Sequence, residues 1–268
     1  MIDIIEQKSI SKTGIESSNE DGLFVSDKYI AAIDGATSHN SKLYKGCTGG
    51  QVVRNIIMET LTKLSGNETC IEGVRTIQNE IETQFPATRF FHAGASAAIL
   101  NIKKRCLWMI GDCQAYINGE KYINHKVIDT VLSQVRSLAL NAFVMNGHSE
   151  DEIAQNDIGR KMIIPFLELQ RKFENQPGYF GYPIFNNVGM PDTTLQSKII
   201  HLDIPKNSEV ILASDGYPVL RPTLKETENE LAKIIATDPF CFKTYFSTKG
   251  LQKNNISFDD RTYIRFKF

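Results

Sequence analysis

Short apolar runs broken by polar turns recur along most of the chain, and they predict β-strands. Tight breaks such as Asp27-Lys28 and Asn118-Gly119 separate neighbouring runs and favour antiparallel hairpins. The last run alternates apolar and polar residues, which predicts a strand with Ile264, Phe266 and Phe268 facing inward. The expected strands cover residues 1–10, 23–25, 29–33, 95–102, 106–110, 115–117, 121–123, 198–204, 210–213 and 262–268.

Helical periodicity marks other segments. Helices are expected over 51–64, 70–85, 223–236 and, in more than one piece, 126–175. Ser149–Glu152 has the sequence of a capping box and should start a helix that Pro165 kinks or ends. Residues 175–196 are expected to form a long surface loop, either functional or mobile. The apolar face expected for the helix that begins near residue 126 comprises Ile128, Val131, Leu132, Val135, Leu138, Ala139 and Ala142.

Composition and charge limit the classes of partner. The chain has 268 residues, of which 41% are hydrophobic and 23% charged, as in a globular protein with a sizeable core. A net charge of -1 gives no basic field to attract nucleic acid or an anionic membrane. The chain lacks a run of about 18 apolar residues, so no membrane span is expected. Its first residues lack the features of a signal peptide, which favours a cytoplasmic location.

The cysteines and histidines show no pattern of a metal or redox site. The five cysteines are odd in number, widely spaced and without a C-x-x-C pair, which indicates reduced cysteines of a cytoplasmic protein. Ser96 lies outside any G-x-S-x-G elbow, so it is not expected to be a nucleophile. Trp108 is expected in the core. The histidines without metal-ligand spacing are His92, His125, His148 and His201.

Acidic residues stand where several predicted strands begin or end. Asp34, Asp112 and Asp215 follow strands, and Asp21 and Asp259 precede strands. If these strands are antiparallel in the usual way, all five acids gather at one rim of the sheets. Each acid could instead be a solvated turn residue, since Asp followed by Gly is also an ordinary turn sequence.

Gathered carboxylates would need cations. Close carboxylates repel one another and raise one another's pKa, and divalent cations remove that penalty. Sites built only from oxygen ligands suit Mg²⁺ or Mn²⁺ better than zinc. A two-metal carboxylate site can activate water and hold a phosphoryl group during in-line displacement.

Six short motifs follow one another along the chain: Asn19-Glu20-Asp21, Asp34-Gly35, Gly94-Ala95-Ser96-Ala97, Gly111-Asp112, Ala213-Ser214-Asp215-Gly216 and Asp259-Asp260-Arg261-Thr262. Their order and approximate spacing resemble the metal-dependent serine/threonine phosphatases of type 2C, the PPM family. The resemblance spans the chain from about residue 10 to its end. It implies one PPM-type domain over residues 1–268, with a divergent helical and loop region at about 125–196. The implied fold is α+β, a four-layer αββα sandwich of two antiparallel sheets flanked by helices.

The resemblance also implies roles for the acids. Asp34 would bridge two cations, Mn²⁺ or Mg²⁺, and the carbonyl of Gly35 would bind one of them. Asp215 and Asp259 would complete the ligands of one ion, so that Asp34, Asp215 and Asp259 form the catalytic set. The remaining acids are Glu20 and Asp21, which would hold the other ion through water, and Asp112, which would recruit a third, weaker ion. The water between the cations would attack phosphorus directly, without a phosphoenzyme.

The sequence departs from the family pattern at the substrate side. Glu16 stands where members that act on phosphoproteins commonly carry an Arg that holds phosphate. Lys12, Lys45 or Arg221 could substitute for this Arg. Ala36 stands where some members carry a His as general acid; His39 is a candidate replacement, although a His in such a loop is more typical of an exposed surface residue. The pair Asp259-Asp260 replaces the common Asp-Asn, as in bacterial regulatory phosphatases of the sporulation and stress type.

The function expected from these observations is hydrolysis of phosphomonoesters, with phosphoserine or phosphothreonine of a protein as the substrate. A binding module that keeps the fold without turnover is a second hypothesis, favoured by Glu16. A phosphatase for a small metabolite is a third. Nucleic acid and membrane are not expected as partners, and the sequence does not set the oligomeric state.

Overall fold

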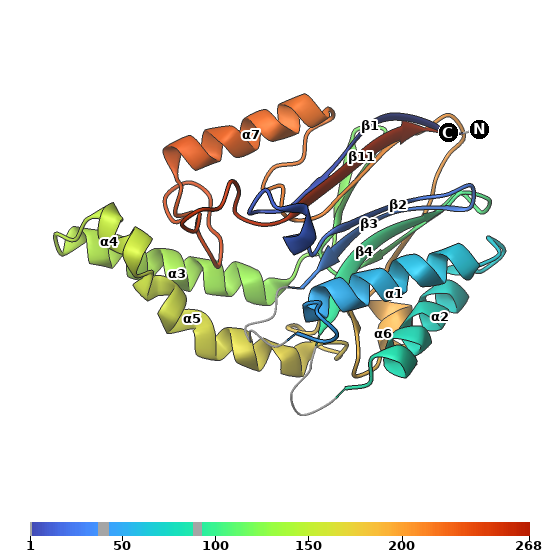
Figure 1. Ribbon diagram of the computed structural model, residues 1–268, viewed down its shortest axis with the longest axis horizontal. Helices are drawn as coiled ribbons and strands as arrows, with labels where there is room; N and C mark the ends of the chain where they lie inside the picture. Colours follow the sequence, from blue (N-terminus) through green and yellow to red (C-terminus); the bar gives the residue numbers. More distant parts are fainter. Residues whose placement is uncertain (1, 37–42, 88–92) are drawn as a thin grey trace.

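The computed structural model describes residues 2–36, 43–87 and 93–268. In these residues the strands form two antiparallel sheets that pack face to face (Figure 1). One sheet has the order β1 (Asp3–Ile10), β11 (Arg261–Lys267), β10 (Glu209–Ala213), β6 (Gln114–Ile117) and β7 (Glu120–Ile123). The other has the order β2 (Gly22–Val25), β3 (Tyr29–Gly35), β4 (Gly94–Asn101), β5 (Cys106–Ile110) and β9 (Ile200–Asp203), and β8 (Phe185–Asn186) pairs with β4.

Alternate residues of β3 contribute to two hydrophobic cores, one on each face of its sheet. Ile30 and Ala32 pack between the two sheets, whereas Ala31 and Ile33 belong to the core on the other face of their sheet. Successive side chains of a strand point to opposite faces, so this strand is apolar at every one of these positions. Leu212, Ile264 and Phe266 complete the inner core from the opposite sheet.

Helices cover both outer faces of the sandwich (Figure 1). The α1 (Gly49–Lys63) and α2 (Cys70–Gln84) helices pack on the sheet that contains β3 and β4. The α7 helix (Leu224–Thr237) packs on the sheet that contains β10 and β11. Thr48, Thr69 and Thr223 cap these three helices through their hydroxyl groups. The αββα sandwich expected from the sequence is therefore confirmed.

A second group of helices lies at one end of the sandwich, away from the chain termini (Figure 1). It consists of α3 (Val127–Met145), α4 (Glu150–Gln155) and α5 (Ile158–Leu169). By length and composition α3 could also cross a membrane. In this structure α3 packs on α5 around Ile128, Leu132, Ile163 and Leu167. A short helix, α6 (Asp192–Ser197), and two single turns, Glu16–Ser18 and Gln170–Phe173, complete the helical elements of the described residues.

Three predictions for residues 126–196 are wrong in detail. On α3 the buried positions include Ile128, Leu132 and Arg136, whereas Val131 and Leu138 are exposed. The buried face is shifted toward Arg136, which is fully buried and forms an ion pair with Asp157.

The helix that begins after Ser149 ends at Gln155, and Pro165 lies in the next helix, which continues to Leu169. The segment 175–196 is not a surface loop, since it contains β8 and α6. Asn175 fixes it by accepting a hydrogen bond from Ile184 N at 2.9 Å and donating one to Ile184 O at 2.9 Å.

Candidate metal centre

Three carboxylate groups meet at one end of the sandwich. Asp34 is the penultimate residue of β3, Asp112 follows β5, and Asp215 follows β10. One carboxylate oxygen from each residue lies within 4.8 Å of the other two. The antiparallel strand order therefore brings acids together that are far apart in the sequence.

Close contacts fix the turn that carries Asp112. Gly111 has a φ of +78°, and a Cβ atom there would lie 2.1 Å from Ser96 Oγ, so only glycine fits. Ser96 pairs with Asp34 across β3 and β4, and its hydroxyl donates a hydrogen bond of 2.6 Å to Asp112 Oδ1. Ser96 therefore positions an acid.

The carboxyl groups of Asp34 and Asp215 share a hydrogen bond and disfavour each other's charge. Loss of hydration raises the pKa of Asp34 well above its usual range, and repulsion by Asp21 and Asp112 adds to this. The side chain of Asp215 is accessible to solvent, yet loss of hydration is also the largest cause of its raised pKa, followed by repulsion from Asp34. In the absence of a cation this pair therefore retains a proton at a pH where isolated aspartates are ionised.

Asp21 is a buried neighbour of this group of acids, close enough to repel Asp34. Its side chain belongs to a residue that is 2% exposed, and its Oδ2 atom has no hydrogen-bond partner among the described residues. Burial raises the pKa of Asp21 well above its usual range, and Asp259, Asp260 and Asp215 raise it further. A buried carboxylate oxygen without a partner is unfavourable unless a cation or an ordered water reaches it.

Asp259 differs from the other acids because two lysines bind it. Lys12 Nζ lies 3.0 Å from Asp259 Oδ1, and the ammonium group of Lys249 forms an ion pair with Oδ2. Burial alone would raise the pKa of Asp259, but Lys249 and Lys12 lower it to about 2. Asp259 is therefore a carboxylate whose charge is already compensated within the chain.

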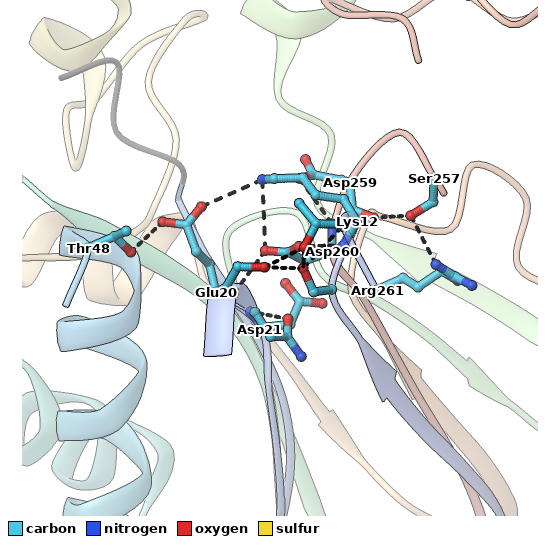
Figure 2. Close-up of polar contacts among 12 residues, drawn as sticks. Lys12, Glu20, Asp21, Thr48, Ser257, Asp259, Asp260 and Arg261 are labelled. Atoms are coloured by element: carbon cyan, nitrogen blue, oxygen red, sulfur yellow. Dashed lines mark hydrogen bonds and ion pairs between the residues drawn. The ribbon is translucent and has the colours of Figure 1, made fainter. Parts of the chain in front are cut away.

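The neighbouring residues hold this arrangement in place (Figure 2). Asp260 accepts hydrogen bonds from the backbone N–H groups of Lys12 at 2.7 Å and Glu20 at 2.8 Å. Thr48, the N-cap of α1, donates a hydrogen bond of 2.6 Å to Glu20 Oε1, and Lys12 Nζ lies 3.6 Å from Glu20 Oε2. Glu20 and Asp260 thereby connect β1, β2, α1 and the segment before β11 at the edge of the site.

A cleft of about 490 Å³ opens beside the acids. Asp34, Gly35, Asp112, Asp215 and Asp259 line it, so five of the seven residues predicted for the site face one space. Glu20 and Asp21 are buried and are not among its lining residues. The divergent region also reaches the cleft, through Asp129 and Ser133 of α3 and through Leu167 of α5, among others.

The basic groups that line the cleft are not those expected from the sequence. Of the three residues considered as substitutes for an Arg at position 16, Lys12 binds the acids, Arg221 pairs with Glu230 at 2.7 Å, and Lys45 lies near the Tyr44 ring, 5.3 Å from its centroid. None of the three lines the cleft, nor does Glu16, which is exposed. Among the described residues, the cationic side chains that do line it are Lys121, Lys126, Arg160 and Lys249.

These lining residues could not be identified from sequence, because they lie on segments without a family motif. Arg160, at the start of α5, donates a hydrogen bond of 2.7 Å to Thr248 O, and Lys126 Nζ lies 3.1 Å from Asp129 Oδ2. The helix cap at Asp157 was the available signal for Arg160, since it places that residue in the first turn of a helix.

The histidines divide into distinct environments. His125 is exposed and lines the cleft, next to Lys126. His148 stacks on Phe143, with ring centroids 3.9 Å apart. His39, the candidate general acid, and His92 lie outside the described residues.

His201 forms a second group of potential ligands with Cys106 and Asp203, at the β5–β9 pair. Two of its three members are exposed on a sheet edge, so we assign no cation to it.

The acids at the end of the sandwich fit a divalent cation. Three carboxylates share a site with oxygen ligands only, burial and repulsion between the acids raise the pKa values of Asp34 and Asp215, and a buried oxygen of Asp21 lacks a hydrogen-bond partner among the described residues. Mn²⁺ and Mg²⁺ are the ions that such a donor set prefers.

Comparison of the whole fold shows that it resembles the fold of PPM-type serine/threonine phosphatases. The serine/threonine phosphatase PstP/Ppp of Mycobacterium tuberculosis matches with a TM-score of 0.50 and 14% identity, covering 99% of each chain. The photosystem II phosphatase PBCP matches with a TM-score of 0.51 and 14% identity, covering 100% of this chain and 99% of that one. The catalytic domain of PstP with two manganese ions is a weaker match, with a TM-score of 0.45 and 14% identity over 100% and 99% of the chains.

At the level of sequence the chain stands apart. No protein-family model matches it, and no curated protein sequence matches it. The fold is thus shared with the phosphatases, while the residues around the acids have to be interpreted from their own chemistry.

Proposed function

We propose that this protein is a metal-dependent phosphatase that hydrolyses phosphomonoesters. The observation that carries the proposal is the meeting of Asp34, Asp112 and Asp215 within 4.8 Å in a cleft of a PPM-type fold. Three acids that repel one another in a protein of this fold are best explained by a resident cation.

The three aspartates would hold Mn²⁺ or Mg²⁺. When bound, such an ion lowers the pKa of water and offsets the charge of phosphoryl oxygens. Asp34 and Asp215 then lose their shared proton, because a coordinating carboxylate has to be ionised. Ser96 keeps Asp112 in position through its hydrogen bond of 2.6 Å.

The basic side chains of the cleft would hold the phosphate group. Arg160 is the strongest candidate, because a guanidinium group offers several planar donors and only one contact of this group, to Thr248 O, is present among the described residues. Lys126 is partly compensated by Asp129 at 3.1 Å and would contribute mainly a positive potential. His125, beside it, is a candidate for protonating the leaving oxygen.

A protein phosphoserine or phosphothreonine is the proposed substrate. The cleft is open to solvent and is formed in part by helices, so it can accept a side chain presented by another protein. The structural relatives PstP/Ppp and PBCP are phosphatases, and the former is a serine/threonine phosphatase, which supports the same class of substrate here. The five cysteines are unpaired, in keeping with our proposal of a cytoplasmic location.

Hydrolysis of p-nitrophenyl phosphate and of phosphopeptides tests the proposal. Purified protein should turn over in Mn²⁺ and lose activity in EDTA, and Asp34→Asn should lower the rate at least about a hundredfold because it removes a ligand. Asp27→Asn is the matched control, since Asp27 is exposed in the turn at the other end of the same hairpin. Equal activity of Asp34→Asn and the control would rule out the assigned site.

A binding module without turnover is the second candidate function. The ion pairs of Asp259 with Lys12 and Lys249 favour it, because they engage an acid that the family pattern assigns to a cation. Binding of Mn²⁺ without hydrolysis of any phosphopeptide, sugar phosphate or nucleotide in a substrate panel would support this candidate. Preference for a sugar phosphate or nucleotide would instead identify a metabolite phosphatase.

A further inference from the structure

The acids of the site fall into two groups with opposite charge balance. Asp34, Asp112 and Asp215 lie within 4.8 Å of one another, and no basic side chain among the described residues forms an ion pair with them. Asp259 lies on the same cleft but has an ammonium group at each of its two carboxylate oxygens. The first group needs a cation, and the second already has two positive charges.

The two lysines come from different parts of the chain. Lys12 follows β1, and Figure 2 shows it between Glu20, Asp259 and Asp260. Its Nζ atom lies 3.0 Å from Asp259 Oδ1, 3.6 Å from Glu20 Oε2 and 3.8 Å from Asp260 Oδ2. Lys249 lies in the long segment between α7 and β11 and lines the cleft.

The position of these ammonium groups opposes a second cation. A divalent ion bound by Asp259 would lie within a few ångströms of two ammonium groups, and like charges at such distances repel strongly inside a protein. The ammonium group of Lys12 also lies among three carboxylates. Its displacement would leave these carboxylates to repel one another. Asp259, which would be a ligand of the second ion, is therefore already neutralised by two ammonium groups.

We propose that the ammonium groups of Lys12 and Lys249 replace one of the two divalent cations, and that the site binds a single cation at the other three aspartates. This inference rests on the proposed metal-dependent function and concerns how many ions support it. The role assigned to Asp259 changes accordingly. It positions two lysines, and one of these lines the cleft where a phosphoryl group would bind.

Counting bound Mn²⁺ tests the inference without measuring activity. We expect calorimetric titration and metal analysis of the full chain to give one tightly bound Mn²⁺. Lys249→Met and Lys12→Met together should yield a second bound ion, with an affinity raised about tenfold or more over any weak second site of the wild type. Lys249→Arg keeps the charge and should bind one ion, like the wild type.

Lys253→Met is the matched control, because Lys253 is exposed in the same segment. Thermal unfolding without metal identifies variants that do not fold, and Lys249→Met alone then serves in place of the double variant. Two Mn²⁺ ions of similar affinity in the wild type would overturn the inference. A single bound ion in the Lys12→Met/Lys249→Met double variant and in Lys249→Met alone would also overturn it.

These outcomes separate the two proposals. Two bound ions together with phosphatase activity would refute the proposal that the lysines replace a cation, and would leave the proposed function intact. One bound ion without hydrolysis of any phosphorylated substrate would support the replacement of a cation by the lysines and would refute the proposed phosphatase activity. A wild-type protein that binds no Mn²⁺ would refute both.

Discussion

At the scale of single residues, similar positions acquire opposite electrostatic properties from their neighbours. Asp34 and Asp259 both stand at strand ends, yet the pKa of Asp34 is raised by burial and other acids, whereas two lysines lower the pKa of Asp259 to about 2. A carboxylate with a raised pKa is a candidate cation ligand, and one with a lowered pKa is already paired.

Glu228 on α7 gives a prediction that concerns stability alone. Burial would raise the pKa of Glu228, but hydrogen bonds from Arg261, Lys8 and Tyr217 lower it to about 2. A lowered folded-state pKa contributes stability above the unfolded value, and this stability is lost as the pH falls through the folded value. We expect Glu228→Gln to cost about 2 kcal/mol at pH 7, after allowance for partial exposure, and almost nothing near pH 2.

Urea unfolding of wild type and Glu228→Gln at several pH values provides the measurement. The difference between the two proteins should shrink between about pH 4.5 and about pH 2. A difference that does not depend on pH would mean that Glu228 acts through packing. Glu230→Gln, on the same helix and paired with Arg221 near the surface, should change stability by less than about 1 kcal/mol.

At the scale of elements, α3 is connected to the rest of the protein through a buried charge. Arg136 is fully buried, donates hydrogen bonds of 3.0 and 2.6 Å to Asp157 Oδ2, and donates others to the carbonyl groups of Cys241 and Ser247. Asp157 also caps α5, so one ion pair connects two helices with the segment that contains Lys249.

Replacement of Arg136 by Met should lower the free energy of unfolding by about 3–5 kcal/mol, because it leaves the Asp157 carboxylate and two carbonyl groups without their partner. Denaturant unfolding measures this effect, and Lys161→Met is the control, because Lys161 is exposed on α5. A loss below about 1 kcal/mol would show that water replaces the guanidinium group and that the ion pair does not hold the helices.

Arg160 tests whether α5 contributes to substrate binding. We expect Arg160→Met to raise the KM for a phosphopeptide about tenfold with a smaller change in kcat, because it would remove a phosphate contact present before and during the reaction. Arg160→Lys should recover part of the loss. An unchanged KM for Arg160→Met would place phosphate binding on the other basic residues of the cleft.

The sequence was sufficient to predict most elements, because strands and helices of this sandwich follow local patterns. The apolar runs around Asn118-Gly119 became the β6–β7 hairpin, and both turn residues have positive φ. The shifted face of α3 could not be predicted, since burial of Arg136 depends on Asp157 and on a segment about a hundred residues away.

The site could be predicted only in part. Acids at strand ends are visible in the sequence, and antiparallel pairing explains why Asp34, Asp112 and Asp215 meet. The pairing of Lys12 and Lys249 with Asp259 could not be predicted from the sequence. Neither lysine stands beside an acid in the sequence, and their side chains approach Asp259 only in the folded chain.

At the scale of the whole molecule, the candidate metal centre lies at the end of the sandwich where strands of both sheets end. Strands from both sheets supply acids there, so a cation bound among them would connect the sheets. Without the cation, Asp21, Asp34 and Asp215 have raised pKa values in the folded state. A raised carboxyl pKa stabilises the fold at low pH, and this stability is lost as the pH rises from the unfolded value through the folded value.

The unfolding temperature of the metal-free protein should therefore fall as the pH rises above about 4, the ordinary pKa of an aspartate, and Mn²⁺ should raise it more at higher pH, where protons compete less for the ligands. At a free Mn²⁺ concentration of about 100 Kd the gain should be about 2.7 kcal/mol. Scanning fluorimetry of EDTA-treated protein with and without Mn²⁺ measures both effects.

In Asp34→Asn the pH dependence should flatten and the response to Mn²⁺ should shrink, because the substitution removes both a repelling charge and a ligand. The lysine pair at Asp259 should not mask this trend, since its contribution is lost only as the pH falls toward about 2. A metal-free protein whose stability rises over the same pH range would show that these acids are not buried together in solution.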